Sequence, residues 1–404
     1  MPARQCRSVF LCALLISADA CADDWPEVMG PGRSGISQET GWNTDWNNKE
    51  PPLLWKFQAG PGASSCVVSG GRMYTMGSRG DQESVLCLDA ASGKEIWRQM
   101  YDCKFDKRSW DGGPAVTPVL DGERLYTLSF RGQLFCWNAK DGTKLWERHL
   151  VDDLHGLKPN WGWAGSPLVV SDKLIVEPGG KGTSRTALDK LTGETLWQSG
   201  NDPVAYASPI LFSGPALSGV AFFNAAGLSG VDPRDGTELF RQRWKTDFDV
   251  NAVIPVQRDG KFFIGSAYGR GIALIDARSG PVWKNEKLII HFQSPVLLGD
   301  HLYVVEGQAE NPAVLTCLEW STGKVCWRHR AGHERAHLIA VGSKLLVITQ
   351  DGELVLAEAS PAAGNELGRF QAIPKTVFSP PAFSDHRLFI RNNSGTVICY
   401  DMTR

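Results

Sequence analysis

Short apolar runs separated by tight polar turns recur along most of this chain, and residues 187–197 show the pattern most completely. This stretch reads Ala-Leu-Asp-Lys-Leu-Thr-Gly-Glu-Thr-Leu-Trp. It contains two short apolar-polar runs, turns at Thr192 and Gly193, and ends in a large aromatic residue, Trp197. Alternation with a period of two predicts β-strands, and a glycine-containing turn between two such runs predicts a hairpin. The stretch therefore predicts two antiparallel strands.

Imperfect copies of this hairpin follow one another from residue 53 to the end of the chain. The residue that precedes each turn is acidic or an amide: Asp89, Asn138, Asp189, Asp232, Asp276, Glu319, Glu358 and Asp401. The residue that closes each copy is a large aromatic one: Trp97, Trp146, Trp197, Phe240, Trp283, Trp327 and, less clearly, Phe370. A repeat of about 40–50 residues is typical of propellers and arrays.

A second hairpin lies upstream of these copies. A polar or glycine turn is followed there by an apolar pair, as in Asp121-Gly122 before Leu125-Tyr126. Two hairpins make four short antiparallel strands, which is the composition of one propeller blade. No stretch has a sustained helical period. We therefore predict an all-β, eight-bladed β-propeller of four-stranded antiparallel blades over residues 53–404.

The two ends of the repeat region complement each other. The last copy stops at Asp401, before its turn and final strand, whereas the unpaired segment 53–57 carries Trp55 where a closing aromatic residue belongs. We predict that this first strand completes the last blade and closes the ring. Seven blades remain an alternative to eight, because Glu358 and Phe370 mark a weak copy.

Residues 1–22 have the organisation of a secretory signal peptide. Two arginines precede a short apolar run, and small residues then offer a cleavage site before residue 23. We expect an exported protein of the periplasm or cell envelope, with a lipid anchor on Cys21 as the less favoured alternative. Residues 23–52 have no strand or helix period and predict an extended arm. No later apolar segment has the length of a transmembrane helix.

Charge and cysteine content exclude several classes of protein. The 404 residues carry a formal net charge of −2, which gives no basis for a nucleic-acid partner, and the cysteine spacing fits neither a zinc site nor haem attachment. A regular hairpin register places Leu196 opposite Ala187 and Cys326 opposite Cys317. The sequence leaves undecided whether Cys317 and Cys326 form a cross-strand disulfide. Other copies carry a cysteine at the position of Ala187, where we expect a small buried hydrophobe: Cys87, Cys136 and Cys399.

The motif Ala-x-Asp-x-x-Thr-Gly-x-x-x-Trp of residues 187–197 resembles the tryptophan-docking repeat of the pyrroloquinoline-quinone (PQQ) propellers. That superfamily includes the quinoprotein alcohol dehydrogenases and the lipoprotein propeller of the outer-membrane β-barrel assembly machine. The chain is most similar to small exported PQQ-like repeat proteins that open with a Trp-Pro…Gly-Pro…Gly arm, here within residues 25–35. The resemblance implies that each closing tryptophan fills the seam between neighbouring blades.

The loops that lead into the inner strands share one face with the loops that join the middle strands, and this face is the usual site of function in a propeller. If it holds PQQ, as the resemblance to quinoproteins allows, the carboxylates need cations: Arg79, Arg131, Lys181, Arg270 and Arg391. Aromatic and imidazole candidates for ligand binding are Trp110, Trp161, Trp163, His291 and His337. Oxygen ligands for calcium are Asp249, Asn251 and Glu306, and the carboxylate base of an oxidation is Asp249 or Asp111.

Several hallmarks of the quinoprotein dehydrogenases are missing from the sequence: an adjacent Cys-Cys pair, a haem segment and long insertions between blades. We therefore expect a non-catalytic binding or scaffolding protein, a monomer that binds an envelope protein, a peptide or a small ligand on the loop face. The alternative is a PQQ-dependent alcohol or sugar dehydrogenase with PQQ and calcium as cofactors. A third hypothesis is recognition of an envelope polysaccharide by the loop-face tryptophans.

Overall fold

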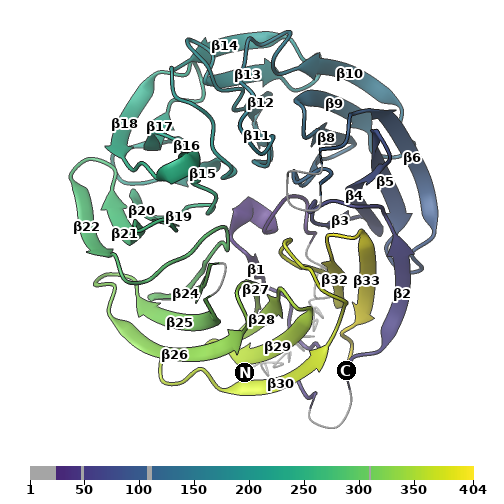
Figure 1. The fold of residues 1–404 in the computed structure, drawn as a ribbon, viewed down its shortest axis with the longest axis vertical. Helices are drawn as coiled ribbons and strands as arrows, with labels where there is room; N and C mark the ends of the chain where they lie inside the picture. The colour runs from purple at the N-terminus through teal and green to yellow at the C-terminus, as the bar shows by residue number, and fades with distance from the viewer. Residues whose placement is uncertain (1–23, 47–49, 107–111, 309–310) are drawn as a thin grey trace, which may run out of the picture.

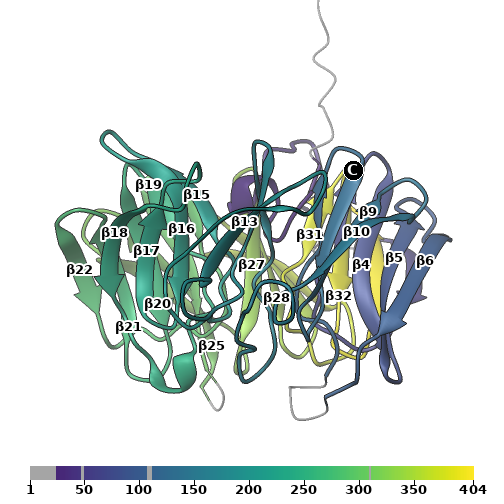
Figure 2. The ribbon, with the colours of Figure 1, turned by 90° about the horizontal axis from the view of Figure 1, so that it is seen from above.

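The computed structural model describes residues 24–46, 50–106, 112–308 and 311–404. Within them, eight sheets stand around a common axis, and the helical segments are two 3₁₀ turns, η1 (Pro31–Arg33) and η2 (Asp247–Asp249) (Figure 1). Seen from the side, the sheets form one thick disc (Figure 2). The prediction of an all-β, eight-bladed propeller is confirmed, and the seven-bladed alternative is excluded.

The first four blades follow the chain, each from its inner to its outer strand. Blade 1 consists of β3 (Val67–Ser69), β4 (Arg72–Arg79), β5 (Gln82–Asp89) and β6 (Glu95–Asp102). Blade 2 consists of β7 (Val119–Asp121), β8 (Arg124–Leu128), β9 (Gln133–Asn138) and β10 (Lys144–His149). Blade 3 consists of β11 (Leu168–Val170), β12 (Lys173–Val176), β13 (Arg185–Asp189) and β14 (Thr195–Ser199). Blade 4 consists of β15 (Ile210–Ser213), β16 (Ser218–Asn224), β17 (Gly227–Val231) and β18 (Glu238–Arg243).

The last four blades complete the ring. Blade 5 consists of β19 (Val256–Arg258), β20 (Lys261–Ser266), β21 (Gly271–Asp276) and β22 (Gly280–Asn285). Blade 6 consists of β23 (Val296–Leu298), β24 (His301–Glu306), β25 (Ala313–Glu319) and β26 (Val325–Gly332). Blade 7 consists of β27 (Ala336–Val341), β28 (Lys344–Thr349), β29 (Glu353–Glu358) and β30 (Glu366–Gln371). Blade 8 consists of β31 (Ala382–Ser384), β32 (Arg387–Arg391), β33 (Thr396–Asp401) and β2 (Leu53–Gln58).

Blade 8 joins the two ends of the repeat region. Strand β2 pairs antiparallel with β33, and the register sets Trp55 opposite Cys399. The indole N–H of Trp55 donates to the carbonyl oxygen of Ala90 in blade 1 at 2.9 Å. The prediction that the first strand completes the last blade is therefore confirmed, and the same strand also forms the seam to blade 1.

Each outer hairpin contains a β-bulge close to its closing aromatic residue. In residues 187–197, Ala187 pairs with Trp197, whereas Leu196 is the extra residue of the bulge and is 46% exposed. The predicted register, with Leu196 opposite Ala187, is therefore wrong. The cause lies in the turn, where Gly193 is left-handed (φ 76°) and the following bulge rotates the strand so that the aromatic ring faces the seam.

The same bulge separates the two cysteines of blade 6. Cys317 pairs with Trp327, and Cys326 is the exposed bulge residue, so both thiols are free. The disulfide that the sequence left open is not formed. The cysteines at the position of Ala187 in other blades are free and buried, as expected: Cys87, Cys136 and Cys399.

Six closing tryptophans share one geometry at the seams between blades. Their indole N–H groups donate to a backbone carbonyl of the next blade over 2.7–3.2 Å: Trp55, Trp97, Trp146, Trp197, Trp283 and Trp327. Each ring also lies against a glycine of that blade, and a Cβ atom on Gly142 would be 2.8 Å from the ring of Trp97. Trp55 and Trp97 are buried and the other four are half-buried, so truncating one of these rings costs up to about 3–5 kcal/mol. The seam role that the resemblance implied is confirmed.

The first part of the arm, with η1 and β1, lies at the centre of the ring (purple in Figure 1), and the later part runs outward along blades 7 and 8, where Trp46 packs against Phe370 of β30. The backbone of Trp25 exchanges two hydrogen bonds with Val68 of β3, at 2.7 and 2.8 Å, and β1 (Ile36–Ser37) pairs in parallel with β27. The buried Arg33 donates to the carbonyl oxygen of Pro209 at 2.6 Å and forms an ion pair with Glu27 at 2.7 Å. The arm is thus fastened to blades on several sides of the ring.

The segment expected to be a signal peptide, including Cys21, lies outside the described residues. In the part of the chain that the structure describes, no helix is long and apolar enough to cross a membrane.

Candidate functional site

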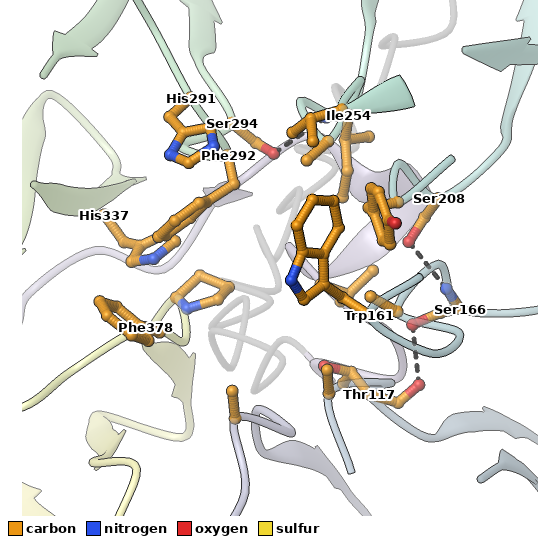
Figure 3. Close-up of a pocket in the computed structure, with 18 of the residues that line it drawn as sticks. Thr117, Trp161, Ser166, Ser208, Ile254, His291, Phe292, Ser294, His337 and Phe378 are labelled. Carbon is orange, nitrogen blue, oxygen red and sulfur yellow. Dashed lines mark hydrogen bonds between the residues drawn. The ribbon is translucent and has the colours of Figure 1, made fainter. Parts of the chain in front are cut away.

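A cavity of about 200 Å³ lies on the axis of the ring, where the loops between blades lead into the inner strands (Figure 3). All eight blades contribute to its lining. The arm adds Val28 and Met29. We call this cavity the channel pocket. Strand β27 lines the pocket with His337 near its start, and β1 of the arm pairs with Ala340 and Val341 at its other end. The arm therefore closes the pocket from the opposite side.

The inner wall of the channel pocket carries hydroxyl groups that hold neighbouring blades together. The loops reach this wall through residues that each precede a proline, among them Thr117, Ser166, Ser208 and Ser294. Ser166 Oγ donates to the carbonyl oxygen of Thr117 at 2.9 Å, and Ser208 Oγ accepts the N–H of Ser166 at 2.9 Å. Ser294 Oγ accepts the N–H of Ile254 at 3.2 Å (Figure 3). Each of these hydroxyl oxygens therefore takes part in a bond between neighbouring loops.

Two residues before these positions, the lining differs between the two sides of the pocket. Small side chains stand there in four blades: Ala63, Ala115, Ala164 and Ala252. Aromatic side chains stand there in three others: Tyr206, Phe292 and Phe378. Trp161 lies across the pocket from Phe292, Phe378 and His337 (Figure 3). The small alanine side chains leave open space between the aromatic side chains of the lining. We call this space the slot.

Aromatic side chains follow one another around the pocket and its rim. The centroid distances are 5.8 Å for Tyr206–Trp161, 6.4 Å for Trp161–Phe248, 6.0 Å for Phe248–Tyr268, 5.5 Å for Tyr268–His291, 5.1 Å for His291–Phe292, 5.5 Å for Phe292–His337 and 5.5 Å for Phe292–Phe378. We call these eight rings the aromatic arc. Seven of them come from the loops between blades or from the start of β27, and Tyr268 comes from the loop that joins β20 to β21 within blade 5.

The described lining of the channel pocket carries no charge at neutral pH. Burial lowers the pKa of both His291 and His337 to about 4, and the positive charge of Arg335 adds to the effect. The guanidinium carbon of Arg335 lies 5.5 Å from the centre of the Phe292 ring, and its Nη1 donates to Gln350 at 2.8 Å. None of the described residues that line the pocket is an aspartate, glutamate, lysine or arginine.

The structure brings three of the predicted site residues into the pocket: Trp161, His291 and His337. Trp163 is buried elsewhere, where its ring covers Gly132 and its N–H donates to the carbonyl oxygen of Glu177 at 3.2 Å. Trp110 and Asp111 lie outside the described residues.

None of the five predicted cations lines the channel pocket. Arg391 is buried and donates to Thr75 Oγ1 at 2.6 Å and to the carbonyl oxygen of Gly60 at 3.0 Å, and burial lowers its pKa to about 10. It therefore fastens blade 8 to blade 1 instead of facing a ligand. Arg131 and Arg270 donate to the carbonyl oxygens of Lys104 and Lys245. Arg79 and Lys181 are exposed.

The three predicted calcium ligands do not form one site. The Asn251 side chain donates to two backbone carbonyls and accepts from Ser266 at 2.7 Å, and Glu306 accepts from both ends of the Arg328 guanidinium, at 2.8 and 3.0 Å. Asp249 is exposed on η2. Across the described ranges, no three His, Cys, Asp or Glu side chains come together as a metal site.

Sequence reasoning missed most of the aromatic arc. Phe292 and Phe378 have a signal in the sequence, because each stands two residues before a residue of the inner wall that itself precedes proline. Phe248 and Tyr268 have no such signal. They belong to loops of irregular length, and only the folded ring places them beside Trp161 and His291.

Eight four-stranded blades, sealed by tryptophans that dock on glycines, define a propeller of the PQQ-repeat class. A family model described as outer membrane protein assembly factor BamB matches residues 36–107 and 81–329, and the chain belongs to this family.

Individual relatives come from two functional groups. Outer membrane protein assembly factor BamB of Yersinia pestis is 22% identical over 376 residues, which cover 88% of this chain and 90% of the relative. Quinohemoprotein alcohol dehydrogenase ADH IIB of Pseudomonas putida is 31% identical over 137 residues, which cover 31% of this chain and 19% of the relative. The chain therefore spans only a small part of that dehydrogenase.

Solved structures of both groups share the fold. BamB from Moraxella catarrhalis superposes with a TM-score of 0.65 and 16% identity, covering 87% of this chain and 100% of that one. Quinohemoprotein alcohol dehydrogenase from Comamonas testosteroni superposes with a TM-score of 0.67 and 16% identity, covering 96% of this chain and 82% of that one. At such identity the likeness shows the fold alone.

The residues of the channel pocket do not fit PQQ. A cofactor with three carboxylates needs guanidinium or ammonium partners, because an unpaired charge in a buried site is costly. The described pocket lining contains no such group, and Arg391, the most buried of the predicted cations, is bonded to oxygen atoms of blade 1. The described residues also offer no cluster for calcium.

Proposed function

We propose that this chain is an exported, non-catalytic binding or scaffolding propeller of the cell envelope, and that it holds a protein or peptide partner at the channel pocket and its rim. The observation that carries this proposal is the aromatic lining of the pocket, which carries no charge among its described residues. Aromatic groups supply much of the binding energy in protein interfaces, and a concave, largely apolar pocket is the usual form of a binding site. The match to BamB over most of the chain supports a role in the envelope.

The alternative function is a PQQ-dependent alcohol or sugar dehydrogenase. The local identity to quinohemoprotein alcohol dehydrogenases favours it, but this identity covers only a small part of those enzymes. The chemistry needs a cationic clamp and a carboxylate base beside the quinone. Asp249, the described candidate for the base, is exposed on a loop outside the pocket lining.

One experiment separates these two functions. The purified chain is incubated with PQQ and calcium, free cofactor is removed, and retained quinone absorbance and dye-linked oxidation of alcohols and sugars are measured. We expect neither retention nor turnover. Retention together with turnover would replace the binding function by the dehydrogenase.

A second experiment looks for the partner on the correct face. A photoreactive phenylalanine analogue is placed at Phe248, on the rim of the pocket, or at Lys94, in a hairpin turn on the opposite face, and cells that express each variant are irradiated. We expect a discrete adduct with an envelope protein from position 248 only. Equal adducts from both positions, or none from either, would contradict the proposal.

Export and assembly state are tested directly. We expect the full chain in the periplasmic or envelope fraction, and a variant that lacks residues 1–22 in the cytoplasm. Light scattering of the purified chain is expected to give the mass of a monomer. A stable dimer would contradict the proposed monomeric state.

A further inference from the structure

The rim of the channel pocket carries an exposed aromatic side chain on a strained loop. Phe248 is 65% exposed, and Phe248 and Asp249 both adopt left-handed backbone conformations, with φ of 61° and 59°. Residues other than glycine rarely adopt this conformation, and it persists only where the surroundings impose it. Here the side chain of Asn251 fastens the loop by donating to the carbonyl oxygens of Asn224 and Trp244, at 2.7 and 3.0 Å.

The strained loop gives Phe248 a defined place in the aromatic arc. Its ring stands edge-on to Trp161 at 6.4 Å and to Tyr268 at 6.0 Å. The arc therefore continues from the half-buried rings of Phe292 and Phe378 to an exposed ring at the rim. Strained positions cluster at ligand clamps in proteins, so the combination of strain, exposure and continuity points to a ligand that runs from the pocket out over the rim.

Size and charge restrict what enters the pocket. An engineered cavity of about 150 Å³ holds one benzene molecule. The channel pocket, at about 200 Å³, thus has room for one group of ring size. Its described lining carries no charged side chain, so a charged ligand would lose its hydration without gaining a partner. The hydroxyl oxygens of Ser166, Ser208 and Ser294 already take part in bonds between loops, and most of the other described lining residues are apolar or aromatic, which suits a ring better than the many hydroxyls of a sugar.

We propose that the channel pocket and Phe248 form a clamp for one uncharged aromatic side chain, presented by an extended segment of a partner protein. The ring enters between Trp161 and the wall of Phe292 and Phe378 (Figure 3), and the adjoining backbone passes over Phe248. This inference rests on the proposed function and specifies its ligand. An aromatic ring fits the slot because offset and edge-to-face contacts with Trp161 on one side, and with Phe292 and Phe378 on the other, are favourable.

The test uses a fluorinated amino-acid amide as the probe. Binding of N-acetyl-4-fluorophenylalaninamide to the purified chain is measured by fluorine NMR, with N-acetyl-leucinamide, N-acetyl-lysinamide and methyl glucoside as competitors. We expect the probe to bind and the three competitors to leave it in place. Trp161→Ala and Phe248→Ala are each expected to weaken binding about 2- to 12-fold, because each removes one aromatic contact.

Leu157→Ala is the matched control for the exposed ring. Leu157 is 64% exposed, lies in the loop between β10 and β11 on the same face, and is not part of the aromatic arc. Its truncation is expected to change probe binding less than about 2-fold. Thermal unfolding of all three variants checks that the ring remains intact. An effect of Leu157→Ala equal to that of Phe248→Ala would overturn the clamp.

Failure of the clamp and failure of the proposed function give different results. No probe binding to the unmodified chain, together with an envelope adduct from position 248, overturns the clamp and leaves the binding function in place. Displacement of the probe by methyl glucoside overturns the clamp in favour of a carbohydrate ligand. Retention of PQQ with turnover overturns both proposals.

Discussion

The seam formed by Trp55 gives the sharpest test of how the ring is held closed. The Trp55 side chain is buried, its N–H donates to the carbonyl oxygen of Ala90 at 2.9 Å, and its ring covers Gly93. Trp55→Ala removes all of these contacts across the junction between blade 8 and blade 1. Because β2 is the one strand that the described N-terminal residues contribute to blade 8, we expect this variant to weaken both the blade and the closure.

The magnitude follows from the contacts that are lost. Truncation of a buried Trp costs about 3–5 kcal/mol, and leaving the buried carbonyl of Ala90 without its donor adds about 1 kcal/mol. We therefore expect Trp55→Ala to lower the free energy of unfolding by about 5 kcal/mol. Trp55→Phe keeps most of the ring and loses the donor, so its expected cost is about 1–2 kcal/mol.

Urea unfolding, followed by circular dichroism and by fluorescence, measures these costs. Leu54→Ala is the matched control, because Leu54 is the neighbouring residue of the same strand and is 42% exposed. Its expected cost is within about 0.5 kcal/mol of zero. A second readout is limited proteolysis of the segment before β3, which is expected to become accessible only in Trp55→Ala. If Trp55→Ala costs no more than about 1 kcal/mol beyond Leu54→Ala, the contacts of Trp55 do not hold the ring closed.

Three further predictions concern packing, the arm and pH. Gly142→Ala places a Cβ 2.8 Å from the Trp97 ring at a left-handed position, so it is expected to cost more in urea unfolding than Gly122→Ala, which is also left-handed but has open space. Arg33→Met leaves buried carbonyls without their donor, and chymotrypsin, whose sites at Trp42 and Trp46 are unchanged, is expected to cleave the arm faster than in the wild type. Because burial lowers the pKa of His337 to about 4, the unfolded chain binds its proton more readily, and stability is expected to fall as pH drops from about 6.5 towards about 4. His337→Phe is expected to reduce that fall, whereas His333→Phe, at an exposed position, is expected to leave it unchanged. Equal dependence of stability on pH in the two variants would contradict the role of His337.

The sequence by itself determined the architecture of this protein. The spacing of the turn residues and closing aromatics favoured eight blades over seven, and the missing final strand of the last copy indicated that the strand with Trp55 supplies it. These features are local or periodic, so each hairpin carries its own signal and repetition averages out the weak copies. The one local error, the position of Leu196, arose because a one-residue bulge has no separate signature in an alternating pattern.

The candidate site was decided by the tertiary structure. Trp161, His291 and His337 were predicted from their loops and do meet in the pocket, but Arg391 and Asn251 come from equally suitable positions and turn into the protein. Residue type and loop position do not tell whether a polar side chain faces a ligand or a buried carbonyl. That choice depends on which oxygen atoms neighbouring blades leave without a donor, and only the closed ring brings those atoms within reach. For the same reason, the aromatic arc emerges from loops that are far apart in sequence and adjacent only around the axis.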